Sequence, residues 1–148
     1  MKSIFDKTTR AELIGRINNL NENSTAQWGK MNINQMIKHC VLFEEMCLGK
    51  KKYKRAFIGR LFGGIALKNM LKDEKPFQRN APTSADFKIK EVDGNVSSEK
   101  RKWMALVEEY EQFSNDDFVH WFFGRMTKEQ VGYFAYKHSD HHLRQFNA

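Results

Sequence analysis

Apolar side chains recur at intervals of three and four residues in four stretches of the chain, which is the spacing of one face of an α-helix. The helices expected from this spacing cover residues 9–20, 33–48, 97–113 and 127–146. No stretch shows sustained alternation of apolar and polar residues, so we expect no strands. The pattern therefore predicts an all-α fold, a four-helix bundle with one long connection between its second and third helices.

Capping signals support the starts of three of these helices. Asn32 with Gln35, and Thr127 with Gln130, match the capping box, in which two side chains bond to each other's backbone N–H groups. Residues 9–12 (TRAE) have the same pattern. Each signal places a helix start within a few residues.

The long connection, residues 49–96, contains an apolar stretch at 56–71 that we expect to form a short helix, although three glycines weaken it. We expect this helix to act as a lid over the end of the bundle, and a membrane-lying or partner-binding helix is the alternative. Residues 75–96 have loop composition and are expected to close over a site. Phe77, Arg79 and Phe87 are candidates to line it.

Length and composition indicate a single domain spanning residues 1–148. Hydrophobic residues make up 41% of the 148, which is ample material for one core. The chain contains no apolar run long enough to span a membrane, and its first residues lack a secretory signal, so we expect a cytoplasmic protein. Cys40 and Cys47 are seven residues apart on one expected helix, roughly 10 Å, which is beyond disulfide reach. Free thiols suit a reducing compartment.

Basic residues outnumber acidic ones, giving a net charge of +7, and they cluster at residues 50–55, KKKYKR. Such a cluster could contact nucleic acid or an anionic membrane. The simpler interpretation is a solvated loop after a helix end, where lysine also suits the helix dipole. Because no nucleic-acid-binding motif accompanies the charge, we expect neither nucleic acid nor membrane as a partner.

The last helix carries the strongest chemical signal. His138 and His142 are four residues apart, so their rings lie one turn apart on the same face, where two histidines can hold one metal ion. Ser139 stands where a zinc peptidase of this kind has its glutamate, so that activity is not expected. The alternative is a pair of imidazoles that are only packed or solvated.

His39 is the best candidate for a third ligand because it lies within the apolar stripe of the second helix. A histidine at such a position is also common as a core residue without a ligand. The two others, His120 and His141, are expected in a loop and off the stripe, respectively.

Two segments of the sequence, WGKMNINQMIKHC (28–40) and FFGRMTKEQVGYFAYKHSDHHLRQF (122–146), resemble the DinB/YfiT-like superfamily of metalloenzymes. More narrowly, they resemble an uncharacterised bacterial branch with a closing HxxHHxRQF signature. The resemblance implies a four-helix bundle with a divalent metal, zinc or nickel, held by His39, His138 and His142. It also implies thiol-dependent transferase or isomerase chemistry, with no particular reaction for this branch.

Two classes of function follow from these observations. One is a metal-dependent enzyme: a transferase that activates a low-molecular-weight thiol, or a hydrolase that activates water. Arg144 and Gln145 are its candidate substrate-binding residues, and no catalytic side chain is assigned. The other is a non-enzymatic binding module in which a metal is incidental or absent. A homodimer is an open possibility for either class.

Overall fold

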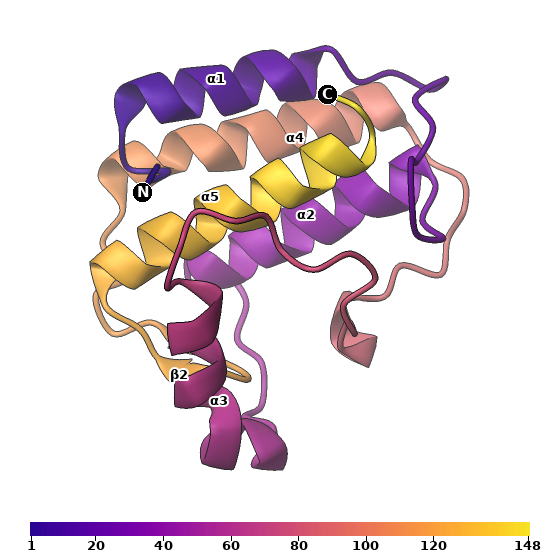
Figure 1. Ribbon diagram of the computed structural model, residues 1–148. Coiled ribbons are helices and arrows are strands. Elements are labelled where there is room, and N and C mark those ends of the chain that lie inside the picture. The colour runs from indigo at the N-terminus through magenta and orange to yellow at the C-terminus, as the bar shows by residue number, and fades with distance from the viewer.

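The computed structural model describes all 148 residues, and most of the chain is helical (Figure 1). The five α-helices are α1 (Lys7–Asn18), α2 (Ile33–Cys47), α3 (Phe57–Met70), α4 (Val96–Glu109) and α5 (Lys128–Gln145). The remaining elements are two 3₁₀ turns, η1 (Ala85–Phe87) and η2 (Tyr110–Gln112), and an antiparallel hairpin of β1 (Val119–His120) and β2 (Gly124–Arg125). The expected all-α class is confirmed.

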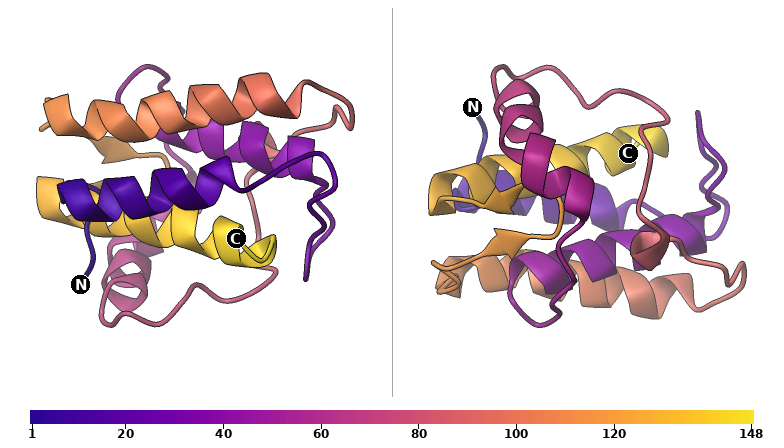
Figure 2. Two further views of the ribbon diagram at one scale, coloured as in Figure 1. Left: turned by 90° about the horizontal axis from the view of Figure 1, so that it is seen from above. Right: turned by 90° about the horizontal axis from the view of Figure 1, so that it is seen from below.

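Four of the helices enclose one hydrophobic core. Helix α4 packs against α1 and α2, and α5 packs against the same two helices, as the views from above and below show (Figure 2). The core contains 27 buried hydrophobic residues. The apolar stripe predicted on α2 lies within it, so the histidine in that stripe is carried to the inside of the protein.

The capping boxes predicted for α2 and α5 are confirmed. The side chain of Asn32 accepts a hydrogen bond from the Gln35 N–H, Thr127 accepts one from Gln130, and both boxes are reciprocal. The box predicted at residues 9–12 is wrong, because α1 begins at Lys7. The first residues of the chain are anchored in the core and the helix starts from them, so Thr9 is already buried within its first turns.

The prediction of no strands is also wrong, because residues 119–125 form the short hairpin. Its strands are two residues each, too short for an alternating pattern to show in the sequence. His120, expected in a loop, is buried here, and its Nδ1 accepts hydrogen bonds from the N–H groups of Phe122 and Phe123. This histidine therefore closes the turn of the hairpin.

Helix α3 confirms the helix expected within the long connection, and it stands apart from the other four, beside the hairpin (Figure 1). The structure thus has the four main helices expected and, as a fifth, the one expected in the connection. Helix α4 ends at Glu109 and continues as the turn η2, where a single helix to residue 113 was expected. Cys40 and Cys47 are free and buried, as predicted. None of the helices combines the length and apolar character needed to cross a membrane.

Candidate metal centre

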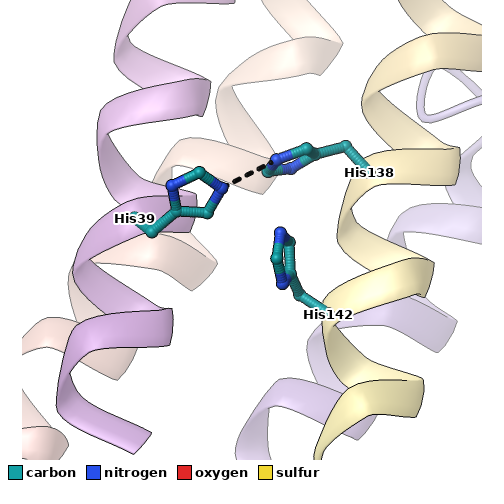
Figure 3. Close-up of side chains that lie close together, drawn as sticks. All are labelled: His39, His138 and His142. Carbon is teal, nitrogen blue, oxygen red and sulfur yellow. Dashed lines mark hydrogen bonds between the residues drawn. The ribbon is translucent and has the colours of Figure 1, made fainter. Parts of the chain in front are cut away.

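Three histidines from two helices meet inside the protein. His39 extends from α2, and His138 and His142 extend from successive turns of α5 toward it (Figure 3). One ring nitrogen from each lies within 4.8 Å of those of the others, and all three residues are buried. The ring centres are 4.7 to 5.2 Å apart. The structure therefore brings together the three histidines that were candidate ligands.

Two of the rings are fixed by oxygen acceptors behind them. His39 Nδ1 lies 3.0 Å from the carbonyl oxygen of Phe87, in η1, and His142 Nδ1 lies 2.9 Å from Oε1 of Gln145. Because these oxygens can only accept, each Nδ1 carries the hydrogen and each Nε2 is left with a lone pair. This is the arrangement in which metal-binding histidines are usually held.

His138 is held in a different way. Its ring stacks on Phe43, with centres 3.6 Å apart, and its Nε2 lies 3.2 Å from Nε2 of His39. Its Nδ1 is buried without a hydrogen-bonding partner. Two nitrogens of neighbouring imidazoles therefore face each other at the centre of the cluster.

Burial also keeps these rings neutral. It lowers the pKa of His39, and it lowers the pKa values of His138 and His142 well below the usual value, with the neighbouring histidines acting in the same direction. Since only an unprotonated nitrogen binds a metal, the environment favours the form of the side chain that can act as a ligand.

No carboxylate hydrogen-bonds to the three histidines. Glu44, Glu45 and Asp140, which lie near them in sequence, bond elsewhere. Their partners are Tyr110 and Ser139 for Glu44, Lys51 and Lys102 for Glu45, and Arg16 and Arg144 for Asp140. The orienting acceptors are therefore a backbone carbonyl and an amide, which the sequence pattern could not indicate.

The two candidate substrate-binding residues lie in different environments. Gln145 is buried, and its amide bridges His142 and the carbonyl oxygen of Trp28, which accepts from Nε2 at 2.8 Å. Its polar atoms are thus engaged within the protein, where they orient a histidine. Arg144 is exposed and pairs with Asp140 at 2.7 Å, which leaves the rest of its guanidinium accessible.

A pocket of about 520 Å³ lies beside the cluster. Its lining residues are Gln27, Trp28, Pro76, Phe77, Arg79, His141, Arg144 and Asn147. Arg79 lies over the ring of Trp28, 4.2 Å from its centre, and the ring centre of His141 is 5.1 Å from that of His142. The pocket therefore has two cationic side chains, no acidic one, and a histidine whose ring lies next to that of His142. The helical spacing predicts that His141 lies off the stripe, and in the structure it lies outside the cluster.

The fold and this cluster define a mostly helical protein with three buried histidines that could hold a metal ion. The chain belongs to a family described as proteins of unknown function, DUF1569, whose model matches residues 5–148. Neither a curated protein nor a solved structure matches the chain.

Proposed function

We propose that the protein is a metal-dependent enzyme of the DinB/YfiT-like kind. In this proposal α1, α2, α4 and α5 form its four-helix bundle, with α3 and η1 in the long connection between the second and third bundle helices. His39, His138 and His142 hold one divalent ion, zinc or nickel. The packing of the four helices around one core supports the bundle, and the position of the histidines between two of them supports the site.

The observation that carries this proposal is the meeting of three buried histidines whose ring nitrogens lie within 4.8 Å of one another. Two nitrogens that each lie 2.0–2.1 Å from a tetrahedral zinc ion are roughly 3.3 Å apart. The 3.2 Å between Nε2 of His39 and Nε2 of His138 matches that separation. Without an ion, the same two nitrogens are joined by a hydrogen bond that Nε2 of His138 donates to Nε2 of His39.

Three histidines leave a coordination position for a further ligand, which is the pattern of catalytic rather than structural sites. A divalent ion held there supplies Lewis acidity to a water or a thiol, so a hydrolase and a thiol-dependent transferase are both compatible reaction types. In either case the residues of this chain keep the ligands neutral and oriented, and they shield the site from bulk water.

The adjoining pocket indicates the class of substrate. Arg79 and Arg144 present two positive charges, and the rings of Trp28 and Phe77 provide apolar walls. A small anionic molecule with an apolar portion fits these features, and a low-molecular-weight thiol that carries a carboxylate is one such molecule. Gln145 then contributes by holding His142, and Arg144 by binding the anionic group.

Metal stoichiometry tests the proposal. Protein prepared without a histidine tag is stripped with a chelator and titrated with zinc and with nickel, for the wild type and for His39→Ala, His138→Ala and His142→Ala. We expect one ion per chain for the wild type, and affinity weakened by more than about a hundredfold in each variant, since even residues that only orient ligands contribute 10–100-fold.

The matched control is His141→Ala, which removes a histidine next to the cluster but outside it. It should bind the ion as the wild type does. If the wild type binds no ion stoichiometrically, or if His141→Ala weakens binding as much as the other variants, the enzyme proposal fails and the protein is better described as a binding module.

A further inference from the structure

Helix α3 presents a continuous apolar face to solvent. Five large apolar residues on it are exposed: Phe57 (75%), Ile58 (62%), Leu61 (60%), Phe62 (57%) and Ile65 (65%). At 100° per residue these positions fall within an arc of about 140°, so they form one face of the helix. Large apolar residues are normally exposed singly, and a contiguous group indicates a surface that is covered by something else.

The orientation of this face is fixed by the opposite side of the helix. A Cβ atom on Gly59 would lie 2.4 Å from the carbonyl oxygen of Phe122, and one on Gly63 would lie 2.1 Å from the same atom. These glycines therefore let the backbone of α3 rest directly on the hairpin turn. Leu67 is buried on the same side. The helix cannot rotate its apolar face inward without losing this close packing.

The segment that carries α3 is also strongly basic. Between residues 50 and 72 there are eight basic residues and no acidic one: Lys50, Lys51, Lys52, Lys54, Arg55, Arg60, Lys68 and Lys72. Of these, only Lys50 and Lys51 form ion pairs within the protein. The net charge of the whole chain is +7, so this segment accounts for the positive balance.

We propose that α3 docks the protein on an anionic membrane surface. The helix lies in the plane of the interface, its five apolar side chains enter the boundary between headgroups and acyl chains, and the flanking lysines contact lipid phosphates. Long basic side chains suit this arrangement because their stems lie along apolar surface while their charges reach the headgroups.

The charge distinguishes this occupant from a second copy of the chain. A symmetric dimer through α3 would bring two segments of eight basic residues together, which like-charge repulsion opposes. The sequence alone favoured a solvated loop and no membrane partner. The inference departs from that expectation because the structure shows all five apolar residues exposed on one face, with their orientation fixed by Gly59 and Gly63.

Vesicle sedimentation tests the proposal with the full-length protein. The probes are vesicles of phosphatidylcholine alone and vesicles with about 30% phosphatidylglycerol. We expect binding to the anionic vesicles at 100 mM salt, little binding to the neutral ones, and a marked loss of binding at 500 mM salt, since screening weakens the attraction. No binding to anionic vesicles would overturn the proposal.

Two pairs of variants separate the apolar and charged contributions. Phe62→Asp should weaken binding at least tenfold, whereas Val92→Asp, at an equally exposed apolar residue (58%) outside α3, should not. Replacing Lys52 and Lys54 by alanine should weaken binding by about 25-fold, roughly fivefold for each lysine. The same change at the exposed pair Lys88 and Lys90 should have little effect.

The same preparations are examined by light scattering for oligomeric state, and by circular dichroism to show that each variant is folded. A wild-type dimer that Phe62→Asp converts to a monomer would mean that a second copy covers the face, and would overturn the proposal. Equal binding by Phe62→Asp and Val92→Asp would also overturn it, because the apolar face would then have no part in docking.

Discussion

Glu44 offers a test of the core that lies between the two histidine-bearing helices. Its side chain is fully buried on α2 and accepts hydrogen bonds from Tyr110 at 2.6 Å and from Ser139 at 2.9 Å. Burial raises the pKa of this carboxyl from 4.5 to about 7, although the hydrogen bonds act in the opposite direction. The charged form is therefore disfavoured in the folded protein.

This displacement of the pKa makes stability depend on pH. Between pH 4.5 and about 7 the folded protein holds the proton of Glu44 and the unfolded chain has released it, so the free energy of unfolding falls as the pH rises. At about 1.4 kcal/mol for each pH unit, the full loss is about 3 kcal/mol and is complete above pH 7. Glu44→Gln, whose side chain stays neutral at every pH, should remove this loss of stability.

The measurement is urea unfolding of wild type and Glu44→Gln at intervals from pH 4.5 to pH 8, followed by circular dichroism. The buried histidines have lowered pKa values and contribute the opposite trend, with stability rising toward pH 6.5. Because they are common to both proteins, their contribution cancels in the difference. We expect the variant to gain about 3 kcal/mol relative to the wild type across this range.

Glu22→Gln serves as the control, since it makes the same chemical change at a residue that is exposed in the loop after α1. A difference between Glu44→Gln and wild type that stays within about 1 kcal/mol from pH 5 to pH 8 would refute the reasoning. It would mean that the carboxylate of Glu44 ionises in the folded protein without the cost of burial.

Two further predictions concern α3 and the histidine cluster. Gly63→Ala should be less stable than Gly64→Ala by about 1–3 kcal/mol in urea unfolding. Both variants gain the same helix propensity, but only Gly63→Ala places a Cβ atom against the Phe122 carbonyl oxygen. Equal stabilities of the two variants would show that α3 does not rest on the hairpin. Gln145→Leu should weaken zinc binding 10–100-fold in a competition titration, because His142 loses its acceptor; unchanged affinity would show that this bond does not orient the ligand.

The errors in the sequence-based description have a common cause, which is that short elements and exact ends depend on contacts between distant segments. The hairpin at residues 119–125 has strands of two residues and is closed by His120, which no periodic pattern reveals. The start of α1 is set where Arg10 bonds to the carbonyl oxygens of Ile4 and Phe5. Local propensity at residues 9–12 could not compete with these contacts.

The sequence by itself determined the helical class and the buried faces of α2, α4 and α5, because the period of 3.6 residues fixes which side chains share a face. The same period placed His138 and His142 together. Spacing could not indicate whether the ring of His39 lies next to these two rings, because the distance between them depends on how α2 packs against α5. It also could not identify the carbonyl of Phe87 behind His39, 48 positions away.

The exposure of α3 was likewise decided by the tertiary structure. Its sequence predicts an apolar helix, but the pattern does not indicate whether the apolar face is buried or exposed. The outcome depends on the backbone contact between its glycines and the turn at Phe122, which lies about sixty residues further along the chain. Periodicity determines which residues share a face, whereas the packing of distant segments determines what each face meets.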